Sequence, residues 1–168
     1  MEIKYQTALN NNPVIRPTTG DFANGRNYSF SLKPLTIDDI VNLEATYNSG
    51  NQFPPSLREL LFLAGQRCYV LDYGLNDTQA EMQEDVRENL VDRTLNILTR
   101  PYFVIDMHRS DAFLFVYLDE GVNDPLVYQA DLDSNLDLDY PRIMSLQASL
   151  SSFVNARIAS LQSGLNPF

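Results

Sequence analysis

Residues 131–140 concentrate side chains that could do chemistry. They read DLDSNLDLDY, with four aspartates and an asparagine interleaved with leucines. Carboxylates at this density are found in calcium sites, in pairs of catalytic acids, and on surfaces that meet a charged partner. Each possibility makes a different demand on the neighbouring residues.

A calcium loop of the EF-hand type is excluded by the spacing. Such a loop needs oxygen ligands at alternating positions, a glycine at the sixth position and a glutamate at the twelfth. Counted from Asp131, the first, third and fifth positions fit, but Leu136 takes the sixth and Arg142 the twelfth. We therefore expect neither a metal ion nor another cofactor in this segment.

A catalytic pair of carboxylates is also disfavoured. In an extended chain the four aspartates point to one side and Leu132, Leu136 and Leu138 to the other. Aspartates two residues apart would then lie roughly 6–7 Å apart, close to the separation in inverting glycosidases. That chemistry needs a pocket that raises one carboxyl pKa, whereas four like charges in a row are typical of a solvated face. We interpret the segment as an amphipathic strand or loop with a charged outer side.

Nucleophilic catalysis finds few candidates. Cys68 is the single cysteine and His108 the single histidine, forty residues apart. Cys68 lies in an apolar run that is typical of a buried structural thiol, and His108 lies at a predicted hairpin. The scattered glycines form no phosphate-binding loop. The sequence therefore favours neither nucleophilic catalysis nor phosphate chemistry, while a carboxylate hydrolase would need a deep pocket that holds two close acids.

Charge and length indicate the class of partner. The 168 residues suit a single domain, and 22 acidic against 12 basic residues give a net charge of −10 and a pI near 4.4. Such a surface repels nucleic acid and anionic membranes and attracts basic proteins. No stretch approaches the ~20 apolar residues of a membrane helix, and the N-terminus lacks a secretory signal, so we expect a cytoplasmic protein.

The N-terminal half is predicted to be largely helical. An irregular arm covers residues 1–27, and a short strand is expected at 28–32. A helix capped by Thr36 follows, and its predicted core-facing residues are Ile37, Ile40, Val41 and Leu43. The segment FPPSLRELLFLAG predicts a short buried helix with Ser56 and Glu59 as a capping box and Gly65 as its C-terminal cap.

The remaining elements complete an α+β pattern. CYVLDYG predicts a strand, and a surface helix begins at Thr78, with Glu81 at capping-box spacing. Its buried stripe is Met82, Val86 and Leu90. PYFVIDMH, DAFLFVYLD and PLVYQAD predict an antiparallel meander, with Phe113, Phe115 and Tyr117 as core. A closing helix is expected from about Ser145, with an apolar stripe at Leu146, Leu150, Phe153, Val154, Ile158 and Leu161.

The order of these motifs resembles the SUKH superfamily. The matching segments are LTIDDIVNLEATY followed by FPPSLRELLFLAG, then PYFVIDMHRSDAFLFVYLDEGVNDPLVYQAD, and finally the helix SLQASLSSFVNARI. They span about residues 35–162, so the resemblance covers the predicted core of one SUKH-like domain. Bacterial toxin-immunity proteins belong to this group, together with Syd and the yeast cell-wall and killer-toxin-resistance regulator.

The resemblance implies a non-catalytic binding module, most often an immunity protein that inhibits a cognate toxin. Many such toxins are nucleases with basic clefts, which an acidic protein can occupy. We expect a monomer or weak homodimer. The alternative is a regulatory scaffold of the yeast-regulator or Syd type. The predicted partner-binding residues, hereafter the predicted acidic set, are Asp119, Glu120, Asp124, Tyr128, Asp131, Asp133, Asp137, Asp139 and Tyr140.

Overall fold

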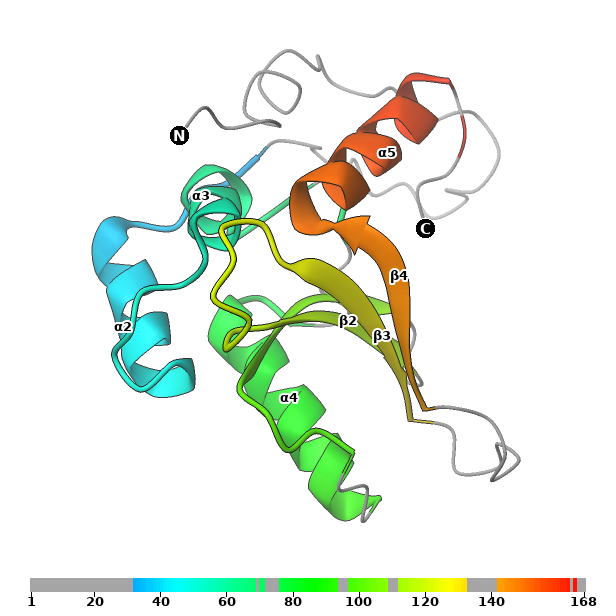
Figure 1. Ribbon diagram of the computed structural model, residues 1–168. Helices are drawn as coiled ribbons and strands as arrows, with labels where there is room; N and C mark the ends of the chain where they lie inside the picture. Colours follow the sequence, from blue (N-terminus) through cyan, green and yellow to red (C-terminus); the bar gives the residue numbers. More distant parts are fainter. Residues whose placement is uncertain are drawn as a thin grey trace.

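In a computed structural model, the described residues are 32–68, 70–71, 76–93, 97–108, 112–132, 142–163 and 165. Within them, four helices and four strands form an α+β fold (Figure 1). In chain order they are α2 (Ile37–Tyr47), α3 (Pro55–Ala64), α4 (Gln79–Asp92), β1 (Tyr102–His108), β2 (Ala112–Tyr117), β3 (Leu126–Asp131), β4 (Ile143–Ser149) and α5 (Leu150–Gln162). The predicted fold class is confirmed, while the predicted arm and nearly all of the strand at 28–32 lie outside the described residues.

The sheet is an antiparallel meander in the order β1-β2-β3-β4. Its first three strands are those predicted. The fourth was missed, because residues 143–149 were assigned partly to the closing helix. That helix begins only at Leu150, where Leu150, Val154 and Ile158 form the buried stripe. The spacing of Leu146 and Leu150 continues the helical period backwards, whereas pairing with β3 makes the segment a strand.

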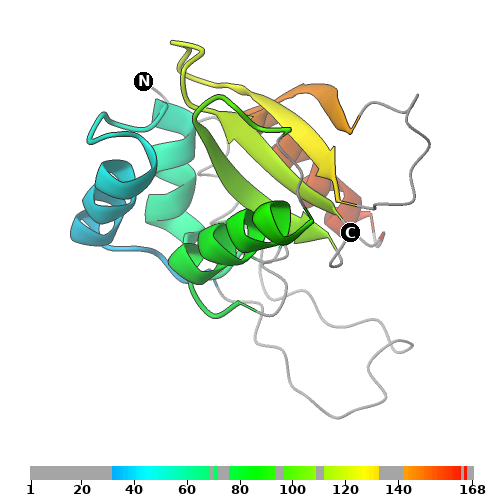
Figure 2. The ribbon, with the colours of Figure 1, turned by 90° about the horizontal axis from the view of Figure 1, so that it is seen from below.

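Two hydrophobic cores lie on opposite faces of the sheet. Figure 2 shows α4 in front of the sheet and α5 behind it. One core joins α2, α3 and α5 to side chains such as Phe103 and Val116. The other joins the predicted stripe of α4 to the alternating residues Phe113, Phe115 and Tyr117. Strand β2 is thus buried on both faces, as its continuous apolar sequence indicates.

Local signals set two helix starts correctly and one incorrectly. Thr36 caps α2 as expected, and it also makes a capping box with Asp39 that was not predicted. Thr78 makes the expected capping box with Glu81. Helix α3 begins two residues too early for the predicted box, because Pro55 is its first residue, and no side chain caps it. Ser56 therefore lies inside the helix.

Three apolar residues predicted to face the core are exposed. They are Ile37 and Val41 on α2 and Phe62 on α3. On α2, the polar residue Glu44 is buried instead, where its Oε1 atom accepts a hydrogen bond from the Phe53 amide at 2.8 Å. The buried face of α2 is therefore rotated from the one that hydrophobicity alone indicates.

The segment predicted as a strand around Cys68 is not one in its described part. Residues 68, 70 and 71 are coil, turn and bend, although Cys68, Val70 and Leu71 are all buried. Among the described residues nearby, an isolated bridge pairs Lys33 with Arg67. The described apolar residues of this run are there because the run is buried, and not because it pairs with a neighbouring strand.

Strand β1 is an edge of the sheet, and α4 covers that edge. The buried amide of Gln83 donates to the Val104 carbonyl at 2.8 Å and accepts from the Val104 N–H at 3.0 Å. This side chain replaces one residue of a neighbouring strand. It satisfies backbone groups that would otherwise invite pairing with another chain.

Candidate functional site

The first acids of the predicted acidic set lie just beyond the end of β2. Asp119 forms a bidentate ion pair with Arg100, at 2.6 Å from Nη2 to Oδ1 and 3.0 Å from Nε to Oδ2. The hydrogen bond from Arg100 holds the pKa of Asp119 below its usual value. The same guanidinium lies 3.9 Å from the centre of the Tyr117 ring and 3.8 Å from Glu120. A cation from outside the acidic stretch thus offsets part of its charge.

Tyr128, a predicted anchor, belongs to an aromatic cluster on the sheet. Its ring stacks on Phe115 at 5.6 Å between centroids and meets Tyr117 edge-on at 4.9 Å. Its hydroxyl donates to Glu120 at 3.0 Å. Burial raises the pKa of Tyr128, as does the hydrogen bond to this carboxylate. The residue is half-buried, so only part of it could contact a partner.

Asp124 has a structural role. It accepts hydrogen bonds from the amide of Ser151 at 3.0 Å and from its hydroxyl at 2.6 Å. These bonds cap the N-terminus of α5, where the helix dipole favours a carboxylate. Burial alone would raise the pKa of Asp124, but the hydrogen bonds outweigh it and the pKa is lowered. The neighbouring Asn123 carbonyl accepts from the Ser56 amide at 3.0 Å, so the turn also holds α3.

The fold separates the described members of the predicted acidic set. Asp119 and Glu120 follow the last residue of β2, whereas Asp131 pairs with Ala112, the first residue of β2. A strand of this length spans about 17 Å, so Asp131 lies at the opposite end of the sheet. The other four members, Asp133, Asp137, Asp139 and Tyr140, lie outside the described residues. A role for the set in partner binding stays a prediction.

A second acidic surface, not predicted, runs along α4. We call it the α4 acidic face; it consists of the exposed residues Asp77, Glu81, Glu84, Glu88 and Asp92. Within the helix these residues recur every three or four positions, opposite the buried stripe. The periodicity of the sequence could have revealed this face, because acids and apolar residues alternate with the helical repeat.

Both arginines near this face turn inward. Arg87 lies between the rings of Tyr47 and Tyr102, 4.4 and 4.5 Å from their centres, and donates to the Tyr102 carbonyl at 3.2 Å. Arg93 donates to the Leu132 carbonyl at 2.8 Å. The α4 acidic face therefore presents several carboxylates to solvent, while Arg87 and Arg93 hydrogen-bond to backbone carbonyls inside the protein.

Cys68 and His108 are the two reactive residues that the sequence offered as candidates. The Cys68 thiol is buried, and burial raises its pKa to about 12, so it is protonated at neutral pH and structural, as predicted. The side chain of His108 lies outside the described residues. Among the residues that the structure describes, no group of three or more histidines, cysteines or acids is arranged to hold a metal ion.

Sequence reasoning missed a buried ion pair between β1 and α5. A bulge between Val104 and Asp106 turns Asp106 toward α5, where it pairs with Arg157. Arg157 also donates to the Val70 carbonyl at 2.8 Å and lies 4.5 Å from the centre of the Phe153 ring. The contacts of Arg157 thus connect β1, α5 and the segment around Val70. No local sequence signal indicates this ion pair.

The structure thus describes a single α+β domain with a central meander and an acidic outer helix. A scan against protein-family models, a search of curated proteins and a search of solved structures each found no match. In the described ranges, no helix combines the length and apolarity required to cross a membrane.

Proposed function

We propose that this chain is a non-catalytic binding module, an immunity protein that binds and inhibits a cognate basic toxin. The observation that supports it most is the α4 acidic face, because its carboxylates are exposed while Arg87 and Arg93 point into the protein. The resemblance of the ordered motifs to SUKH proteins supports the same class.

The physical effect of such a face is long-range attraction. Carboxylates gathered on one helix produce a negative potential that steers a basic protein into contact and raises the association rate by 10- to 1000-fold at low salt. Added salt screens this attraction beyond about 8–10 Å. If the toxin is a nuclease, the acidic helix competes with phosphates for the basic cleft of the enzyme.

An affinity pull-down from native lysate tests the proposal. The tagged protein serves as bait at low and moderate salt, beside a bait in which Glu84→Gln, Glu88→Gln and Asp92→Asn are combined, the α4 variant. We expect the native bait to retain a basic toxin domain in stoichiometric amount, and the α4 variant to retain much less. Co-expression should then protect cells from that toxin.

Two results would contradict the proposal. A housekeeping protein recovered in place of a toxin would favour a regulatory scaffold. A toxin that is retained but kills cells equally with and without the protein would show binding without immunity.

A further inference from the structure

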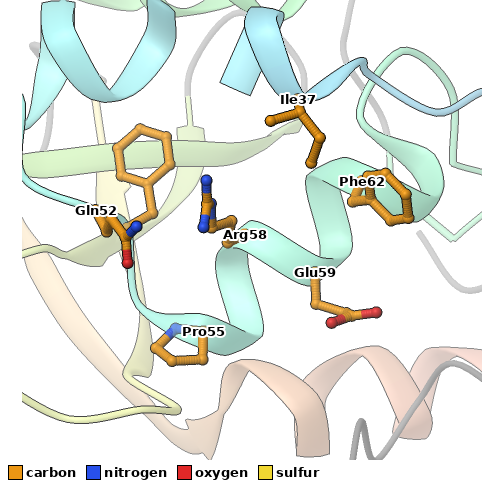
Figure 3. Close-up of a pocket in the computed structure, with 7 residues that line it drawn as sticks. Ile37, Gln52, Pro55, Arg58, Glu59 and Phe62 are labelled. Carbon is orange, nitrogen blue, oxygen red and sulfur yellow. The ribbon is translucent and has the colours of Figure 1, made fainter. Parts of the chain in front are cut away.

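A hollow of about 360 Å³ opens between α2 and α3 (Figure 3). Ile37 lines it from α2, Phe53 lies ahead of α3, and Arg58, Glu59 and Phe62 line it from α3. This volume is at the small end of ligand pockets and suits one or two protein side chains. No described member of the predicted acidic set lines the hollow.

The apolar side chains at this hollow are exposed. Ile37 is 50% exposed and Phe62 is 47% exposed, and Figure 3 shows both at the same end of the hollow. Val41, one turn further along α2, is also exposed. Grouped exposed apolar residues of this kind mark interaction sites more often than isolated ones do.

The charges around the hollow are mainly negative. Arg58 is committed inward, since its Nε lies 3.2 Å from Oε1 of the buried Glu44. Glu59 is half-buried, and no described side chain forms an ion pair or hydrogen bond with it. Asp38, which follows Ile37 in the first turn of α2, is exposed. An occupant with basic groups next to an apolar side chain would complement this arrangement.

Helix α2 connects the hollow to the α4 acidic face. On its other side, Asn42 and Thr46 of α2 and Glu84 of α4 line a second hollow. A partner that reaches across α2 could therefore contact the apolar end of the first hollow and the carboxylates of α4 at once.

Building on the function proposed above, we infer that the hollow between α2 and α3 receives a large apolar side chain of the partner. The occupant is a segment of a basic protein in which a phenylalanine, leucine or methionine is flanked by lysine or arginine. The apolar side chain packs on Ile37 and Phe62, and a flanking cation reaches Glu59. Such a buried anchor supplies affinity, whereas the α4 acidic face supplies speed of association.

Three short synthetic peptides test this inference: one with a central phenylalanine flanked by lysines, one with alanine in its place, and one with phenylalanine flanked by glutamates. Binding is followed by NMR through the methyl resonances of Ile37. We expect the first peptide to bind, the alanine peptide to bind about tenfold more weakly, and the acidic peptide not to bind.

Variants of the chain locate the binding. Phe62→Ala should weaken the lysine–phenylalanine peptide about tenfold and Glu59→Gln about threefold. The control is Val91→Ala, which removes an apolar side chain that is 74% exposed on α4, and it should bind as the native chain does. Circular dichroism confirms that each variant is folded. Equal binding by Phe62→Ala, or equal binding of the phenylalanine and alanine peptides, would overturn the inference.

The inference and the proposed function can fail separately. If the toxin recovered by pull-down binds Phe62→Ala as tightly as the native chain, the hollow is not the anchor site, although the immunity function stands. If the peptides bind as expected but the pull-down recovers a housekeeping protein in place of a toxin, the hollow is a docking site and the proposed function is overturned.

Discussion

The buried pair of Asp106 and Arg157 allows a quantitative prediction about stability. The Asp106 side chain is 1% exposed and the Arg157 side chain 13% exposed, so neither charge is solvated by bulk water. Removing one member leaves the other charge uncompensated, which costs about 3–5 kcal/mol at buried sites. Since Arg157 keeps its bond to the Val70 carbonyl, we place Asp106→Leu at the lower end, about 3 kcal/mol.

The complementary change should cost more. Arg157→Leu leaves the Asp106 carboxylate without its partner and also removes the donor from the Val70 carbonyl, so we expect about 4 kcal/mol. The double variant leaves no unpaired charge. Its cost should fall below the sum of the single costs by at least about 2 kcal/mol, which is the coupling energy of a double-mutant cycle.

Urea denaturation provides the measurement. The chain contains no tryptophan, so far-UV circular dichroism and tyrosine fluorescence follow unfolding. In a thermal melt of a domain of this size, a loss of about 3 kcal/mol in the free energy of unfolding lowers the melting temperature by about 6–12 °C. A coupling energy below about 0.5 kcal/mol would refute the assignment, because it would mean that the two side chains do not depend on each other.

Three further predictions concern local features. Gly65→Ala should destabilise the fold by about 1–3 kcal/mol in thermal melts, because the added Cβ would lie 2.5 Å from the Leu61 carbonyl oxygen. Alanine has the higher helix propensity of the two residues, so a variant more stable than the native chain would contradict this close contact. Asp124→Asn should lower the free energy of unfolding by about 1 kcal/mol near pH 6, because the amide keeps one acceptor oxygen but loses the negative charge and the second acceptor that the carboxylate offers to Ser151 at the start of α5. Because the pKa of Asp124 is lowered in the folded state, the ionised carboxylate stabilises the fold above its unfolded pKa of about 3.9. The difference in free energy of unfolding between the variant and the native chain should therefore vanish as the pH falls through the folded pKa. A constant difference from pH 7 to pH 2 would count against this role of Asp124. The Cys68 thiol should react with a thiol reagent at pH 8 only after unfolding in urea, and rapid labelling of the native chain would contradict its burial.

The parts of the fold that local chemistry determines were predictable. The helix caps at Thr36 and Thr78 depend on residues three positions apart, so the sequence displays them directly. Strands β1, β2 and β3 were predicted because apolar runs separated by short polar links indicate a meander. Strand β4 was not, since its identity comes from pairing with β3 and its half-exposed residues give no period-two pattern.

Surface features that depend on contacts between residues far apart in the sequence could not be predicted. Arg100 offsets the charge of Asp119 across 19 positions, and Ser151 engages Asp124 across 27. Neither contact can be read from a stretch of acids that contains no basic residue. The orientation of α2 was likewise hidden, because burial of Glu44 depends on the Phe53 amide and Arg58. Hydrophobicity alone therefore assigned Ile37 to the core.

Association kinetics show whether an acidic surface steers the chain onto a basic toxin. The α4 variant is compared with a matched variant that combines Asp119→Asn, Glu120→Gln and Asp131→Asn; each changes the net charge of −10 by three charges. We predict that the α4 variant binds the recovered toxin at least about tenfold more slowly at low salt and with a weaker salt dependence, and that the matched variant is affected less. Equal association rates for the native chain and the α4 variant at every salt concentration would mean that the α4 acidic face does not steer the toxin.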